Sequence, residues 1–249
     1  MSERAVRYDG QTADNLARRL GVPEVVLFEQ VGSTLDVAHE RGASGAPAGT
    51  LVLADEQTAG RGRQGRTWVS QPGAGIWLTL VERPRDAAAV GVLSLRLGLA
   101  AAAALDPMAD HPIRVKWPND LYVDNRKLAG ILVEARWREG VLDWIAVGFG
   151  INVQAPQGVP AASLRAGVSR LDALLCLVPA LRRAAMEAGP LRDEELRTFA
   201  GRDYARGRRC REPVEGTVIG IDAGGALLVE GQGGVHTVRA GSLVLVEEA

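Results

Sequence analysis

The order in which short apolar segments and turns follow one another constrains the fold of this chain more than any other feature of its sequence. Most predicted strands come as hairpins: residues 113–116 and 121–123 flank the turn 117–120 (WPND), and residues 128–134 follow at once, with residues 144–148 able to pair with them. A doubly wound parallel sheet would instead need a helix between successive strands. The pattern therefore predicts an α+β fold with a mixed or antiparallel sheet.

Apolar periodicity predicts the other elements of the main domain. Strands are expected at residues 25–28, 51–54 and 76–81, and helices at residues 35–41, 87–105 and 169–199. Ser33 or Thr34 can cap the first of these helices. Pro179 and the pair Gly189-Pro190 are expected to interrupt the last one, because proline lacks the backbone N–H that a helix interior uses.

The composition changes at a short basic hinge, residues 206–211 (RGRRCR). Beyond the hinge, strands are predicted at residues 214–221, 226–229, 235–239 and 243–246, with glycine-rich turns between them. This spacing predicts a small SH3-like barrel, which must pack on its neighbour because its own core is small. We therefore expect a main domain at residues 1–209 and a barrel at residues 210–249.

The bulk composition excludes several classes of protein. The formal net charge is −1, so the charge balance indicates no polyanionic partner. Cys176 and Cys210 match no metal or redox spacing, which favours a reducing, cytoplasmic compartment. Residues 1–9 are polar, unlike a signal peptide, and the apolar stretch 97–105 is far shorter than the ~20 residues that span a bilayer. We expect a soluble protein with no membrane partner.

The most informative segment is the loop at residues 57–68 (QTAGRGRQGRTW). Its glycines allow the backbone to approach a ligand closely, and its three arginines supply charge and forked donors, which together suit a phosphate or a carboxylate. Taken alone, a flexible solvated surface loop explains this segment equally well.

Two more specific explanations of the loop are weaker. Gly60, Gly62 and Gly65 fit the spacing of a dinucleotide fingerprint, but that motif needs a helix to begin at the glycines, and residues 68–75 cannot start one. An RNA contact would require a wider basic and aromatic surface, whereas aromatic residues make up 4% of the chain.

A second set of polar residues surrounds the predicted hairpins. Residues 115–120 (VKWPND) stand at a strand end, and Lys127 precedes an apolar strand that Gly130 interrupts. A glycine inside a strand often marks close approach of a ligand to the backbone, and Asp120 can bind Mg²⁺ through water. Asn152 offers both a donor and an acceptor, as reading a base edge requires. An ordinary charged hairpin explains each of these residues equally well on its own.

In combination and in this order, the motifs resemble the biotin protein ligases. The matching segments are residues 33–34, 57–68, 116–120, 126–134 and 148–152, and residues 225–228 and 240–241 fit the C-terminal barrel of that family. The resemblance runs from about residue 25 to the end of the chain and implies that residues 1–209 form the catalytic domain. It implies a ligase that joins biotin to ATP and then transfers biotin to a lysine of a biotin carboxyl carrier protein.

The resemblance also implies roles for individual residues. Biotin is expected to contact Ser33, Thr34, Gln57, Gly60, Arg61, Gly62, Arg63, Lys127 and Gly130. ATP is expected to contact Arg63, Arg66, Trp68, Lys116, Asn119, Asp120 and, at the adenine, Asn152. Lys127 and Arg63 are the expected catalytic residues, since joining two anions requires fixed cations and Mg²⁺, and Asp120 is a candidate metal ligand.

Two departures from the family pattern limit the resemblance. Leu35 stands where the family commonly has a polar residue, so a side-chain contact is lost there. The segment before residue 25 is too short for the winged DNA-binding domain of some members, so we expect a monofunctional ligase with no DNA partner. The sequence leaves a homodimer open. The alternatives are a lipoate or octanoate ligase or transferase, and a non-catalytic nucleotide- or nucleic-acid-binding module.

Overall fold

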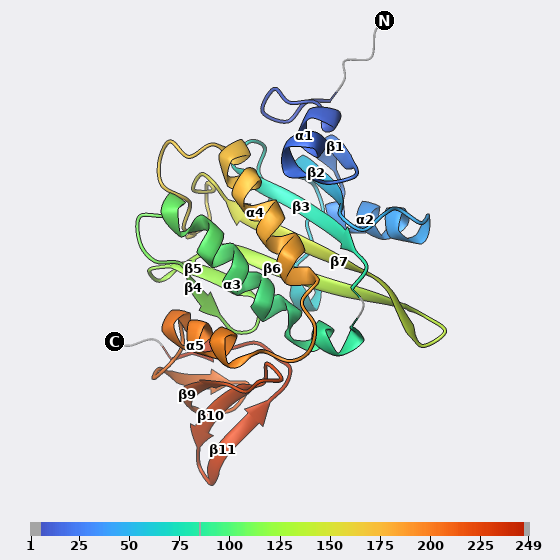
Figure 1. Ribbon diagram of the computed structural model, residues 1–249. Helices are drawn as coiled ribbons and strands as arrows, with labels where there is room; N and C mark the ends of the chain where they lie inside the picture. Colours follow the sequence, from blue (N-terminus) through green and yellow to red (C-terminus); the bar gives the residue numbers. More distant parts are fainter. Residues whose placement is uncertain (1–5, 85, 247–249) are drawn as a thin grey trace, which may run out of the picture.

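The computed structural model describes residues 6–84 and 86–246. Its centre is a seven-stranded sheet in the order β1-β2-β3-β7-β6-β5-β4 (Figure 1). The strands are β1 (Val25–Val31), β2 (Thr50–Gln57), β3 (Gly75–Glu82), β4 (Arg114–Lys116), β5 (Asp120–Val123), β6 (Arg126–Arg138) and β7 (Val141–Asn152). Only β1 and β2 are parallel, and every other pairing in this sheet is antiparallel. The predicted α+β fold with a mixed sheet is confirmed.

Helices cover both faces of this sheet. The helices are α1 (Ala13–Leu20), α2 (Thr34–Ala43), α3 (Leu93–Leu105), α4 (Arg170–Ala185) and α5 (Asp193–Arg202). The larger core includes Leu16 of α1, Leu97 of α3 and Leu177 of α4, whereas α2 packs in a separate cluster on the opposite face, with Leu35 against Val52. Because both faces are covered, all eight residues of β3 are buried instead of alternating.

Two predicted helices differ from the observed ones. The segment expected to form one helix at residues 87–105 is a 3₁₀ helix over Ala87–Val92 followed by α3. Pro179 lies inside α4 without ending it. Proline costs that helix one hydrogen bond, but the buried neighbours Leu177 and Leu181 keep the segment packed in the core. The expected break at Gly189-Pro190 does separate α4 from α5.

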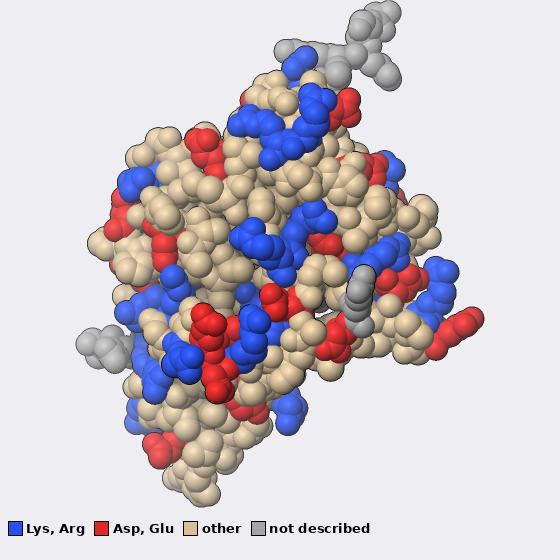
Figure 2. Space-filling view, viewed as in Figure 1, with Lys and Arg blue, Asp and Glu red and all other residues tan. Residues whose placement is uncertain are grey.

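One helical segment, Ala87–Met108, is long and apolar enough to cross a membrane, but it is mostly buried. Its α-helical part packs on the sheet beside α4, as the core helix of a globular fold does (Figure 1). The helix-covered face in Figure 2 mixes basic and acidic side chains and shows no continuous basic patch.

A second sheet forms the C-terminal part of the chain. It is antiparallel, in the order β11-β10-β9-β8-β12, and is consistent with the expected SH3-like domain. Its strands are β8 (Arg209–Glu212), β9 (Gly216–Ile221), β10 (Leu227–Gly231), β11 (Gly234–Val238) and β12 (Val244–Leu245). Strand β8 was expected to be a hinge, and it forms because Cys210 is buried between exposed charged residues.

The second sheet packs directly on the first domain. Val218, Leu227 and Leu243 belong to the same continuous core cluster as the main domain, and the Trp117 indole donates a hydrogen bond to the carbonyl of Gly225 at 2.9 Å. A domain boundary at residues 209 and 210 stays a prediction. Since the two sheets share one core, the C-terminal residues are held close to the turn at residues 117–120.

Candidate active site

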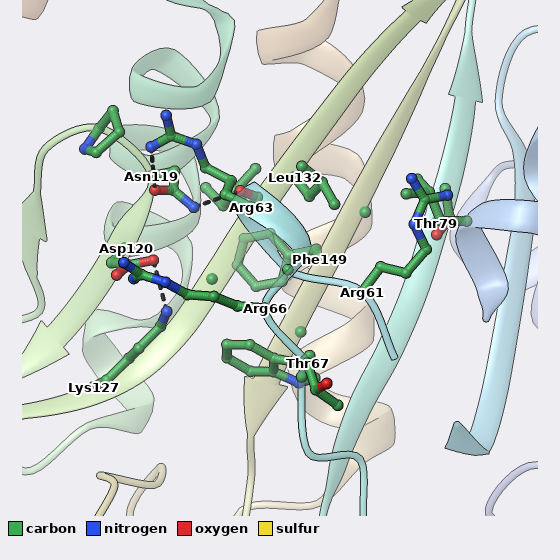
Figure 3. Close-up of a pocket in the computed structure, with 18 of the residues that line it drawn as sticks. Arg61, Arg63, Arg66, Thr67, Thr79, Asn119, Asp120, Lys127, Leu132 and Phe149 are labelled. Carbon is green, nitrogen blue, oxygen red and sulfur yellow. Dashed lines mark hydrogen bonds and ion pairs between the residues drawn. The ribbon is translucent and has the colours of Figure 1, made fainter. Parts of the chain in front are cut away.

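A cavity of about 180 Å³ lies on the face of the sheet that carries α2 (Figure 3). It is lined by the start of α2, the end of β2, strands β3, β6 and β7, the turn at residues 116–120, the loop at residues 61–68, and residues 242–243. We call the loop at residues 57–68 the arginine loop. The cavity thus joins the two motifs that the sequence singled out, although they stand about 50 residues apart.

The floor of the cavity is backbone without side chains. Gly130 of β6 is paired with Gly150 of β7, and Trp68 of the arginine loop packs over both. A Cβ atom at Gly150 would lie 2.6 Å from the Trp68 indole, and one at Gly130 would lie 2.9 Å from it. Any larger residue at either position would displace the indole. Trp68 thus approaches the Gly130 backbone closely, and the expected approach of a ligand to Gly130 stays a prediction.

One end of the cavity is polar, and Arg61, the charged lining residue there among the described residues, is paired with two carboxylates. Gln57 Oε1 accepts hydrogen bonds from the backbone N–H of Thr34 at 2.9 Å and from its hydroxyl at 3.0 Å. The Thr34 hydroxyl also lies 2.9 Å from that of Thr79 on β3, and Gln57 Nε2 donates to Ser70 Oγ at 2.9 Å. Ser33 caps α2 by accepting from the backbone N–H of residue 35. These groups form a row of neutral donors and acceptors at the start of one helix.

The opposite end of the cavity is cationic. Arg63 donates to Asn119 Oδ1 at 3.1 Å and to the carbonyl of Gly241 at 3.3 Å, while Arg66 donates to Ser242 Oγ at 3.4 Å. Burial lowers the pKa of Arg63 from its usual value, an effect that Asp120 opposes. The groups that accept hydrogen bonds from Arg63 and Arg66 are neutral. Neither guanidinium is therefore neutralised by these contacts, and both can bind an anion.

Two lysines complete the cationic end. Lys127 Nζ lies 2.8 Å from Asp120 Oδ1 and 5.0 Å from the centre of the Trp68 ring. Burial lowers the pKa of Lys116, Asp120 opposes this shift, and Lys127 reinforces it. Four cations and one carboxylate therefore line this end, an arrangement that suits a ligand with several negative charges.

Most of the expected site residues line this one cavity. They are Ser33, Thr34, Gln57, Arg61, Gly62, Arg63, Arg66, Trp68, Lys116, Asn119, Asp120, Lys127 and Gly130. Gly60 and Asn152 do not line it. Gly60 is packed inside the arginine loop, where an added Cβ would lie 2.5 Å from the carbonyl of Trp68. Asn152 is 5% exposed and donates to the carbonyl of Ala162 at 3.0 Å.

Four lining residues lie outside the segments that the sequence singled out: Leu78, Thr79, Ser242 and Leu243. Thr79 had a signal, because it places a hydroxyl inside the apolar strand at residues 75–82. Ser242 and Leu243 had none, since their place beside Arg66 depends on how the second sheet packs on the first.

Among the described residues, no three His, Cys, Asp or Glu side chains are grouped in a way that could hold a metal ion. Asp120 is the one carboxylate among the described residues that line the cavity. Mg²⁺ binds nucleotides through one or two carboxylates, the phosphates and water, so this lining fits an ion that arrives with a nucleotide, and it does not form a cage made by the protein alone.

Comparisons with known proteins agree with the fold. Residues 27–152 match the Biotin/lipoate A/B protein ligase family. The chain is 33% identical over 241 residues to the bifunctional ligase/repressor BirA of Bacillus subtilis, covering 89% of this chain and 74% of the relative. It is 36% identical over 245 residues to the biotin–[acetyl-CoA-carboxylase] ligase of Mycobacterium tuberculosis, covering 90% of each.

The solved structures give the same result. The biotin protein ligase from Aquifex aeolicus in complex with biotin and ATP superposes with a TM-score of 0.73 at 25% identity, covering 90% of this chain and 99% of that chain. The chain belongs to the Biotin/lipoate A/B protein ligase family. Within it, the prediction of a ligase enzyme of the biotin protein ligase group is confirmed.

Proposed function

We propose that this protein activates biotin with ATP to form biotinyl-5'-AMP and then transfers biotin to a lysine of a biotin carboxyl carrier protein. The observation that carries the proposal is the division of one cavity into a neutral hydrogen-bonding end and a cationic end, joined by the glycine floor. Biotin has the matching polarity, with an uncharged ureido ring at one end and a carboxylate at the other.

The neutral end suits the ureido ring. A ureido group has one carbonyl acceptor and two N–H donors, and Ser33, Thr34, Gln57 and Thr79 supply hydroxyl and amide groups of both kinds. Leu35 and Leu132 add apolar surface beside them for the rest of a hydrophobic ligand. This end has no charged lining residue that is free of an ion pair, because the Arg61 guanidinium is paired with carboxylates.

The cationic end suits the first chemical step. A biotin carboxylate oxygen attacks the α-phosphorus of ATP, the new P–O bond forms, and the bond to pyrophosphate breaks. The two reactants are anions, and Lys127, Arg63, Arg66 and Lys116 offset their repulsion and the charge that develops on pyrophosphate. When Mg²⁺ is bound with ATP, it would supply further charge neutralisation on the phosphates, and Asp120 is the lining carboxylate to which we assign its binding.

The second step needs no nucleophile from this chain. The amine of the carrier lysine attacks the acyl carbon of the mixed anhydride, the bond to the phosphate breaks, AMP leaves, and the amine loses its proton. The two cysteines are free, one exposed and one buried, and neither is among the described residues that line the cavity. We place the reaction in the cytoplasm, where ATP is supplied and thiols stay reduced.

An ATP–pyrophosphate exchange assay tests the proposal. Exchange that depends on biotin and not on lipoate or octanoate supports it, and labelling of a carrier domain on one lysine completes the test. Exchange that depends on lipoate would identify the alternative activity of the same family. If the protein binds the nucleotide but none of these acids supports ATP–pyrophosphate exchange, the protein is a non-catalytic binding module.

A further inference from the structure

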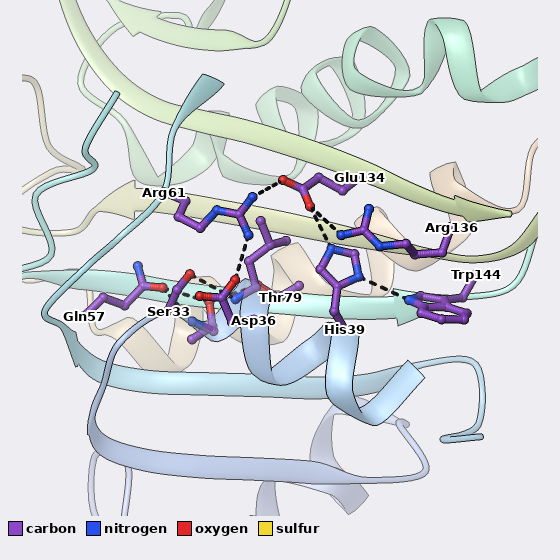
Figure 4. Close-up of polar contacts among 11 residues, drawn as sticks. Ser33, Asp36, His39, Gln57, Arg61, Thr79, Glu134, Arg136 and Trp144 are labelled. Atoms are coloured by element: carbon purple, nitrogen blue, oxygen red, sulfur yellow. Dashed lines mark hydrogen bonds and ion pairs between the residues drawn. The ribbon is translucent and has the colours of Figure 1, made fainter. Parts of the chain in front are cut away.

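The three arginines of the arginine loop do not make the same kind of contact; Figure 3 shows all three, and Figure 4 shows the partners of Arg61. Arg61 Nη1 donates to Asp36 Oδ1 at 2.7 Å, and Arg61 Nη2 donates to Glu134 Oε1 at 2.6 Å. Asp36 lies in the first turn of α2 and Glu134 lies in β6. One guanidinium therefore bridges the helix and the strand that flank the neutral end of the cavity.

The charges of the loop are divided accordingly. Arg63 and Arg66 contact an amide oxygen, a backbone carbonyl and a hydroxyl, all of which are neutral. Arg61 is paired with two carboxylates instead. A cation that two carboxylates already neutralise has no net charge to offer an anionic substrate. The contacts of Arg61 therefore hold the loop to α2 and β6. Arg63 and Arg66, which are not paired with carboxylates, can bind an anionic ligand.

Glu134 is held in place independently of the loop. Its second oxygen, Oε2, lies 2.8 Å from His39 Nε2 and 3.3 Å from Arg136 Nη2. The Trp144 indole N–H, which can only donate, lies 3.3 Å from His39 Nδ1, so Nδ1 accepts and the ring hydrogen on Nε2 points to Glu134. Because Glu134 is only 19% exposed at its side chain, Arg61 meets a carboxylate that is already fixed.

Backbone hydrogen bonds connect Arg61 to the rest of the arginine loop, so holding Arg61 in place also holds the loop. Arg61 forms a backbone bridge with Thr67, the N–H of Gly62 donates to the carbonyl of Arg66 at 2.7 Å, and the N–H of Trp68 donates to the carbonyl of Gly60 at 2.8 Å. These bonds make a short hairpin with Arg61 at its base. The side chains that reach the phosphate end are carried on this hairpin.

We propose that Asp36 and Glu134 are positioning residues that fasten the arginine loop in its closed arrangement by holding Arg61. Arg61 then acts on the reaction through the loop that carries Arg63 and Arg66. The attachment of the loop through Arg61 does not depend on the proposed function. The further inference that this attachment retains the activated acyl adenylate rests on the proposed function. Each partly exposed ion pair of this kind shifts an equilibrium by about two- to fivefold, and the two pairs share one guanidinium.

Hydrogen exchange of the free protein, with no substrate added, tests the fastening. In Glu134→Gln and Arg61→Gln, the backbone amides of residues 58–66 should exchange about two- to fivefold faster than in the wild type. The double variant should exchange no faster than Arg61→Gln alone, because Glu134 acts through Arg61. Glu40→Gln is the matched control: it removes the same charge from the exposed side of α2 and should leave these amides unchanged.

Unchanged protection in Glu134→Gln, or additive effects in the double variant, would overturn the proposal. The second measurement is the rate at which adenylate leaves the enzyme, which should rise in Glu134→Gln and Asp36→Asn while the rate of its synthesis falls less. Absence of biotin-dependent exchange in the wild type would defeat the proposed function and leave the hydrogen-exchange result standing. If the enzyme is active but the exchange rates of the loop amides are the same in Glu134→Gln as in the wild type, only the proposed role of Glu134 in holding the loop is wrong.

Discussion

Lys127 Nζ lies 2.8 Å from Asp120 Oδ1, and the two residues come from neighbouring strands, β6 and β5. The ammonium is thereby held over the Trp68 ring, at the boundary between the glycine floor and the cationic end. A lysine in this position is fixed before any substrate arrives, so it can act on a carboxylate and a phosphate without first being ordered.

The Lys127→Ala variant should lose most of its adenylation activity. Removing one fixed electrostatic donor raises such a barrier by ~2–4 kcal/mol, and the change also leaves the Asp120 carboxylate beside the phosphate site without its cation. Pyrophosphate exchange at saturating biotin and ATP measures the effect. Arg126→Ala, at the exposed neighbouring position, is the matched control and should be close to wild type. Near-normal exchange in Lys127→Ala would remove this residue from the reaction.

The glycine floor predicts a second effect. In Gly150→Ala, the new methyl group would lie 2.6 Å from the Trp68 indole, so the ring must move out of its place over β6 and β7. Overpacking of this kind costs about 1–3 kcal/mol of stability, and the affinity for ATP and biotin should fall by more than the stability change explains. Calorimetric titration and thermal unfolding measure the two quantities separately. Gly91→Ala has open space around its Cβ and should change neither.

The local patterns in the sequence predicted the elements near the cavity well. The β6–β7 pairing and the turn at residues 117–120 follow from alternation and turn residues close together in the chain. The observed β5, β6 and β7 contain the predicted strands, whereas β4 begins one residue later than predicted. What could not be predicted is set by packing between distant segments. The contact of Arg61 with biotin is implied by the family resemblance and stays a prediction, whereas its pairing with Glu134 could not be predicted, because the two residues are 73 positions apart.

Other differences come from burial overriding local preference. Pro179 stays inside a helix because that helix is packed in the core, and the charged residues 209–212 form a strand in which the side chain of Cys210 is buried. The expected contact of Asn152 with the adenine stays a prediction; the sequence did not indicate that its side-chain nitrogen donates to the carbonyl of Ala162, in a loop that no periodicity predicts.

Asp203 predicts a pH dependence of stability. It is 6% exposed, one of its oxygens has no hydrogen-bond partner, and burial raises its pKa to about 6. A carboxyl whose pKa is raised by folding binds a proton more tightly in the folded state, so stability is greatest below the unfolded pKa of about 4 and is lost as the pH rises through 6. Asp203→Asn mimics the protonated form, so its free energy of unfolding should exceed that of the wild type by about 2 kcal/mol more at pH 8 than at pH 4.

Urea unfolding of both proteins at pH 4, 6 and 8 measures this difference. The hydrogen bond from the backbone N–H of Ala205 to Asp203 Oδ1 is kept in the variant, so the comparison isolates the charge. A constant difference across the three pH values would show that the Asp203 carboxyl titrates as it does in the unfolded chain.

The last prediction concerns Arg63→Gly. The Arg63 guanidinium joins two segments, the turn at Asn119 and the C-terminal segment at Gly241, across the cationic end of the cavity. A mixed anhydride is useful only if it is kept from water and from other amines until the carrier lysine arrives. Because the variant loses both joining contacts but keeps Lys127, adenylate synthesis should fall less than adenylate retention.

Incubation of this variant with biotin, ATP and an unrelated lysine-rich protein measures the escape of activated biotin. We expect bystander labelling above the wild-type level, with slower but detectable labelling of the carrier domain. Arg63→Ala separates the loss of the guanidinium from the added freedom of a glycine backbone, and it should label the bystander as well. A different outcome is that neither variant labels the bystander and carrier labelling is only slower. Arg63 would then contribute to ATP binding and not to closure of the loop. A contact used only to bind the nucleotide affects the rate without releasing the intermediate.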